Sequence, residues 1–77
     1  MERHLFLAAP WSEDQQDAAT LSVYYDITTG HYECDIDNRS AGVIKQDESG
    51  LWVEVNSGEQ TALSKRAGEL IDKRKDG

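Results

Sequence analysis

Hydrophobic and polar side chains alternate along two neighbouring segments in the middle of the chain. In residues 21–27 the apolar side chains occupy the odd-numbered positions, and in residues 31–37 they occupy the even-numbered positions. Alternation with a period of two is typical of a β-strand that has one buried and one exposed face. A short turn would join the two strands, and a loop with an even number of residues sets Ile27 opposite Tyr32, so that the apolar side chains share one face.

Further strands are predicted on either side of this hairpin. The apolar run of residues 3–8 predicts a first strand, which Pro10 ends because proline has no amide hydrogen to donate. Residues 47–50 (DESG) have the aspartate and the glycine that a type I turn prefers. A four-residue loop at this position directs Leu51 toward the core and the adjacent Trp52 toward the outer side of the sheet.

Two segments combine a capping pattern with helical spacing. Near the C-terminus, Ser57 and Gln60 form a capping-box pattern, and apolar side chains follow at the i, i+4, i+7 and i+8 positions of one helical face. Basic residues at 73–75 close this helix, where cations suit the helix dipole. The same capping pattern recurs at Ser12 and predicts a short N-terminal helix over residues 13–19.

Together these elements predict one small α+β domain that covers residues 1–77. The expected architecture is an antiparallel sheet of four to five strands with the C-terminal helix packed on one face, a short N-terminal helix, and an outer face open to water. The predicted core is drawn from the strands and the C-terminal helix and comprises Leu5, Leu7, Leu21, Val23, Tyr25, Ile27, Tyr32, Cys34, Ile36, Ile44, Leu51, Val53, Val55, Leu63, Ala67, Leu70 and Ile71.

The chain is acidic, and its charge is unevenly distributed. The 77 residues carry a net charge of −7 at pH 7; residues 1–60 hold twelve acidic and three basic residues, whereas residues 61–77 hold three acidic and five basic residues. An acidic body repels nucleic acid and anionic membranes and favours a basic protein surface as partner. A negative net charge also keeps small domains soluble, which is the simpler interpretation.

Cysteine content and hydropathy bear on the compartment. Cys34 is the single cysteine, so the chain contains no internal disulfide. The apolar residues 5–9 are too few for a signal peptide or a membrane span. We therefore expect a cytoplasmic protein.

The segment HYECDID, residues 31–37, has the composition of a metal or catalytic site. Its outer-face residues are His31, Glu33, Asp35 and Asp37. Successive same-face positions on a strand stand roughly 7 Å apart, whereas the ligands of one ion lie about 2.0–2.6 Å from it. Cys34 alternates with the core side, and an open sheet face offers no pocket for a pair of catalytic carboxylates. We expect no metal, no cofactor and no enzymatic activity.

The same outer face is a candidate binding surface. Its acidic side chains gain nothing for the sheet when they stand side by side, and neither strand of the hairpin contains a lysine or arginine to neutralise them. Trp52, and Trp11 if it faces outward, would be an anchor for a partner, although Trp52 could instead pack under the N-terminal segment. The predicted partner-binding residues are Tyr24, Asp26, Glu33, Asp35, Asp37 and Trp52.

The leading hypothesis is a small non-enzymatic inhibitor, a monomer or small homodimer, that docks its acidic face on a basic nucleic-acid-binding surface of a protein partner. Charge would steer the association, and aromatic anchors would slow the release. In size, acidity and lack of a catalytic motif the chain resembles, in general profile, the phage-encoded inhibitors of bacterial defence systems, including anti-CRISPR proteins. The alternative is a structural or assembly subunit that self-associates through an open strand edge or through the outer aromatic residues, with an acidic surface that only confers solubility.

Overall fold

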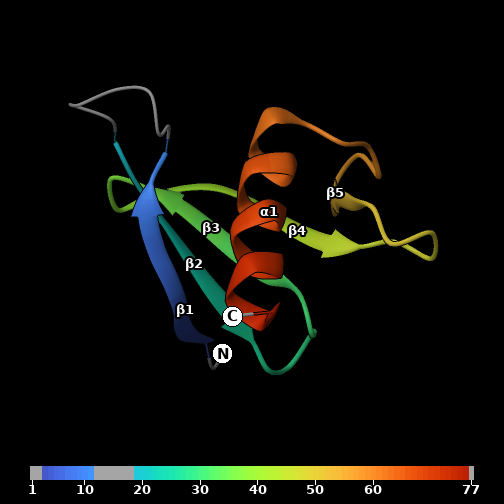
Figure 1. The fold of residues 1–77 in the computed structure, drawn as a ribbon, viewed down its shortest axis with the longest axis horizontal. Helices are drawn as coiled ribbons and strands as arrows, with labels where there is room; N and C mark the ends of the chain where they lie inside the picture. Colours follow the sequence, from blue (N-terminus) through green and yellow to red (C-terminus); the bar gives the residue numbers. More distant parts are fainter. Residues whose placement is uncertain (1–2, 12–18, 77) are drawn as a thin grey trace.

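The computed structural model describes residues 3–11 and 19–76, in which five β-strands precede one α-helix. The elements are β1 (Arg3–Pro10), β2 (Thr20–Asp26), β3 (Tyr32–Ile36), β4 (Arg39–Gln46), β5 (Trp52–Glu54) and α1 (Ala62–Asp76). The strands pair in sequence order as one antiparallel sheet, and α1 lies across one face of it (Figure 1). The predicted α+β class is thereby confirmed. The predicted helix over 13–19 falls, apart from its last position, outside the described residues.

The core lies between the sheet and α1. Its buried members that the alternation predicted are Leu21, Val23, Tyr32, Cys34, Ile44, Leu63, Ala67 and Ile71. Val53, also predicted, is buried but does not belong to this cluster. Leu7, Tyr25, Ile36 and Leu70 are half-buried and pack against this core. Removing side chains of this size from water contributes roughly 1.5–3 kcal/mol each, so α1 is held to the sheet mainly by its apolar face.

An aromatic cluster fills the core beside the helix. The Tyr32 ring lies edge-on to the rings of Phe6 and Trp52, with centroid distances of 5.5 Å in both cases, and 5.1 Å from the ring of Tyr25. Trp52 is 6% exposed, and its indole Nε1 donates a hydrogen bond to a carboxylate oxygen of Asp72 at 3.2 Å. The tryptophan thus satisfies its one polar group while its ring packs in the interior.

The helix begins four residues later than the Ser57 capping pattern predicted. The amide of Ser64 donates to Thr61 Oγ1 at 3.1 Å, and the amide of Thr61 donates to Ser64 Oγ at 2.8 Å. This is a reciprocal capping box, with Thr61 as the cap of a helix that starts at Ala62. Ser57 instead accepts a hydrogen bond from the amide of Glu59 within the preceding turn.

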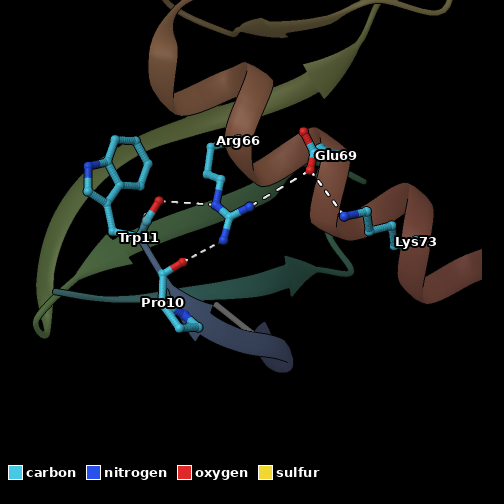
Figure 2. A network of polar contacts seen from close by, with 5 residues as sticks. All are labelled: Pro10, Trp11, Arg66, Glu69 and Lys73. Atoms are coloured by element: carbon cyan, nitrogen blue, oxygen red, sulfur yellow. Dashed lines mark hydrogen bonds and ion pairs between the residues drawn. The ribbon is translucent and has the colours of Figure 1, made fainter. Parts of the chain in front are cut away.

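Arg66 ties α1 to the end of β1 (Figure 2). Its Nε donates to the carbonyl oxygen of Trp11 at 3.0 Å, and a terminal nitrogen donates to the carbonyl oxygen of Pro10 at 2.8 Å. The same guanidinium lies 3.8 Å from Glu69 Oε1, which Lys73 Nζ approaches to 3.2 Å. Charge-assisted hydrogen bonds to two carbonyls fix where the helix crosses the sheet.

The first predicted hairpin has the expected parity but a different register. Tyr25, not Ile27, pairs with Tyr32, and Val23 pairs with Cys34. The loop begins one residue earlier than expected, so Ile27 is 56% exposed and the prediction that it lies in the core is wrong. Because the register differs by two residues, which is one full period of a strand, the remaining apolar side chains of this hairpin still face the helix.

Asp26 explains this earlier loop. Its amide donates to the carbonyl oxygen of His31 at 2.9 Å, and its carbonyl oxygen accepts from the amide of Gly30 at 2.8 Å. Its carboxylate accepts from the amide of Thr28 at 2.9 Å, the local hydrogen bond of an Asx turn. Asp26 is therefore both the last residue of β2, opposite Arg3, and the start of the loop.

The second predicted hairpin has the opposite parity to the one expected. Gln46 pairs with Trp52 rather than Leu51, so Trp52 faces the core and Leu51 is 49% exposed. Asp47 and Leu51 close a three-residue loop in which Gly50 adopts a φ of 93°, the glycine conformation that such loops use. The Asp47 carboxylate accepts hydrogen bonds from Ser49 and from the amide of Leu51, which hold its pKa below the usual range.

Leu5 is another predicted core residue that lies outside the core, and Val55 is only half-buried and does not belong to the core cluster. A bulge between Leu5 and Leu7 leaves Leu5 opposite Tyr24, on the face away from the helix, where it is 59% exposed. Phe6 takes the position against the core and contacts Tyr32. One extra residue in a strand reverses the faces on either side of it, which simple alternation cannot predict.

Candidate functional site

The outer face of the sheet, opposite α1, carries a continuous row of side chains across four strands. Strand pairing sets Leu5 opposite Tyr24, Tyr24 opposite Glu33 and Glu33 opposite Val43. We call these four residues the outer row. Asp35 lies on the same face of β3, two residues along from Glu33. The outer row combines an exposed leucine, an aromatic ring and a carboxylate.

Arg3 covers the centre of this row. Its guanidinium carbon lies 4.2 Å from the centroid of the Tyr24 ring. One terminal nitrogen is 3.2 Å from Glu33 Oε1 and the other is 3.8 Å from Asp35 Oδ2. The acidic pair predicted to stand unneutralised is therefore partly neutralised, by a residue of β1 rather than of the hairpin.

The contacts of Arg3 are partly exposed to water, because the Arg3 side chain is 41% exposed while those of Glu33 and Asp35 are 22% and 12% exposed. Exposed ion pairs contribute about 0.2–1 kcal/mol, and an exposed cation–π contact contributes about 0.5–1 kcal/mol. The arginine is thus held in place by an interaction that a competing cation can replace. Arg3 was not predicted from the sequence. It is two residues from Leu5 and so faces the same side of β1. A charged residue at a position that was predicted to face the core is itself a sign that this end of β1 faces outward.

The remaining predicted acidic residues lie outside the outer row. Asp26 is 6% exposed at the end of β2, where its carboxylate is used by the loop. Asp37 has a φ of 52° and Asn38 a φ of 68°, the two central positions of a type I′ turn between β3 and β4. Asp37 Oδ1 also accepts a hydrogen bond from the amide of Thr20 at 2.9 Å. Both aspartates build turns, so the predicted acidic row is shorter than expected.

The predicted position of Trp52 on the outer face is wrong. Its ring is buried against the helix face of the sheet, and Trp11 is also half-buried and packs against the core. The physical reason for the error is the loop parity at residues 47–51, since a three-residue loop in place of a four-residue loop moves every following side chain to the other face. The aromatic residue that the outer row does present is Tyr24.

Cys34 lies in the core, as predicted, and its thiol is fully buried. Burial, together with the nearby carboxylates of Asp35 and Glu54, raises the pKa of this thiol from 9.0 to about 12. A neutral buried thiol is a poor nucleophile. Across residues 3–11 and 19–76, no group of three histidine, cysteine, aspartate or glutamate side chains is placed to hold a metal ion.

We expect Cys34 to make the fold less stable as the pH rises in the alkaline range. Above pH 9 the unfolded chain releases the thiol proton, whereas the folded chain retains it until about pH 12. The free energy of unfolding should therefore fall by about 1.4 kcal/mol per pH unit across this window. Urea titrations of the wild type and of Cys34→Ala at a series of pH values measure this slope. Equal slopes in the two proteins would show that the thiol does not ionise on unfolding.

Comparison of the chain with protein-family models, with curated proteins and with solved structures found no match. Within the part of the chain that the structure describes, no helix is long and apolar enough to cross a membrane. The function is therefore inferred from the outer face and its charges.

Proposed function

We propose that this chain is a small non-enzymatic binding protein whose outer row docks on a basic surface of a protein partner. The observation that supports this most directly is the exposure of Leu5 beside Tyr24 and Glu33 on the uncovered face of the sheet. None of these three side chains is needed to close the core on the other face. Apolar and aromatic area ringed by charge favours a protein over a small molecule as the ligand.

The charge of the chain supports a basic partner. With a net charge of −7, the protein is attracted to basic surfaces and repelled by nucleic acid, and the attraction accelerates the encounter at low salt. Many basic protein surfaces bind nucleic acid, so docking there would compete with the nucleic acid. Inhibition of a nucleic-acid-binding protein is accordingly the function that we propose.

A pair of matched double variants tests this proposal. Leu5→Lys with Glu33→Lys alters the outer row, whereas Leu51→Lys with Glu48→Lys makes the same chemical changes at the exposed β4–β5 loop. In affinity capture from the native host lysate, quantified by mass spectrometry, we expect the outer-row variant to retain less than about a tenth of the partner, the loss expected when contacts worth about 1.4 kcal/mol are removed.

The loop variant should capture the partner nearly as well as the wild type. Equal losses in both variants would mean that net charge alone, rather than the outer row, drives the association. Full capture by the outer-row variant would contradict the proposal. Circular dichroism of each variant establishes that the fold is retained.

Self-association through a strand edge is the alternative function. β1 and β5 are the edge strands, but β5 has three residues, and β1 contains a bulge and ends in Pro10. Bulges, prolines and short edges are the features by which proteins prevent edge-to-edge pairing. We therefore favour the binding protein, and sedimentation in low and high salt distinguishes it from a salt-tolerant oligomer.

A further inference from the structure

The environment of Arg3 has the chemistry of a binding site for a guanidinium group. The flat face of Tyr24 supports the group from one side at 4.2 Å, and the carboxylates of Glu33 and Asp35 approach its two terminal nitrogens at 3.2 and 3.8 Å. Stacking on an aromatic ring together with carboxylates at the terminal nitrogens suits arginine specifically, because the lysine ammonium is a compact point charge.

In this structure the guanidinium group at the site is that of Arg3, a residue of the same chain. Arg3 stands at the start of edge strand β1 and is 41% exposed, so water already reaches it. Leu5 is exposed beside the ring of Tyr24 and would contact the methylene groups of an incoming arginine side chain.

We infer that Tyr24, Glu33 and Asp35 form a subsite for an arginine side chain of the partner, and that Arg3 occupies it in the free protein. This inference rests on the proposed function, because it identifies the group on the basic partner that the outer row recognises. Displacement of Arg3 by the partner's arginine would exchange one set of polar contacts for an equivalent set that the interface shields from water. Arg3 thereby lowers the affinity of the subsite for other cations.

Removal of Arg3 should vacate the subsite. We expect Arg3→Ala to bind a fluorescent nona-arginine peptide about tenfold more tightly than the wild type does, as measured by fluorescence anisotropy at fixed salt. A nona-lysine peptide should gain much less, because it cannot stack on Tyr24 in the same way. Adding Tyr24→Leu to Arg3→Ala should abolish most of the gain for nona-arginine.

Arg74→Ala is the matched control, because it removes the same charge from an exposed position in the last turn of α1. An equal gain in Arg74→Ala, or an equal gain for nona-lysine, would overturn the inference, since both indicate only a change in overall charge. If only Arg3→Ala gained affinity for nona-arginine, and capture of the partner did not depend on the outer row, the proposed function would be wrong and the subsite would stand. Capture that depends on the outer row without any gain in Arg3→Ala would overturn the subsite alone.

Discussion

Replacing Trp52 by alanine is expected to lower the free energy of unfolding by about 3–5 kcal/mol, the usual cost of truncating a large aromatic residue in a core. The ring contacts Tyr32 at a centroid distance of 5.5 Å and donates a hydrogen bond to Asp72, and both interactions are lost in Trp52→Ala. A domain of 77 residues typically has only about 4–12 kcal/mol of stability in total, so this single change removes a large part of it.

Leu51→Ala is the matched control, because Leu51 adjoins Trp52 and is 49% exposed. Surface truncations usually change the stability by about 0.5 kcal/mol or less. Urea titration followed by circular dichroism compares the midpoints of the two variants, and Trp52→Phe supplies a milder change if Trp52→Ala does not fold. A larger loss in Leu51→Ala than in the Trp52 variants would mean that β5 has the opposite parity.

The error over these two residues shows what period-two alternation can and cannot determine. Leu51, Val53 and Val55 alternate as well as any strand, and the pattern alone placed them in the core. The parity of β5 depends on one more or one fewer residue in the preceding loop, and Gly50 with its positive φ fits a three-residue loop as well as the last position of a four-residue turn. Val53 is nevertheless buried, so burial in this short strand extends to neighbouring residues on both faces.

The fold class was predictable for a different reason. The β2–β3 hairpin and α1 each have a long periodic pattern, and a register error of two residues leaves such a pattern on the same face. The candidate site was less predictable, because its centre is a contact between Arg3 and residues some twenty to thirty positions away in the sequence. Tyr24, Glu33 and Asp35 lie on the outer face as predicted. The carboxylate of Asp26 accepts a hydrogen bond within its own turn, and that of Asp37 accepts one from the amide of Thr20, contacts that alternation does not predict.

Gly68→Ala is expected to destabilise the protein by about 2 kcal/mol, although alanine is the better helix former. At an exposed helical position the change from glycine to alanine would stabilise the helix by about 1 kcal/mol. A Cβ atom on Gly68, however, would lie 2.2 Å from Cγ and 2.7 Å from Cβ of Trp52. These atoms are the inner part of a buried side chain and cannot rotate away, so α1 must move off β5, and overpacking of this kind costs about 1–3 kcal/mol or more.

The sign of the effect is the test, and Lys65 provides the reference, since it is an exposed position of the same helix. Stability should rise from Lys65→Gly to Lys65→Ala, because only backbone freedom differs between these two variants. From glycine to alanine at position 68 it should fall. If both positions showed the same rise in urea titrations, α1 would not rest on Trp52 as closely as the distances require. Opposite signs would show that α1 packs closely over Trp52 because Gly68 has no side chain. The helix then covers this face of the sheet, and the other face, which carries Tyr24, Glu33 and Arg3, stays uncovered.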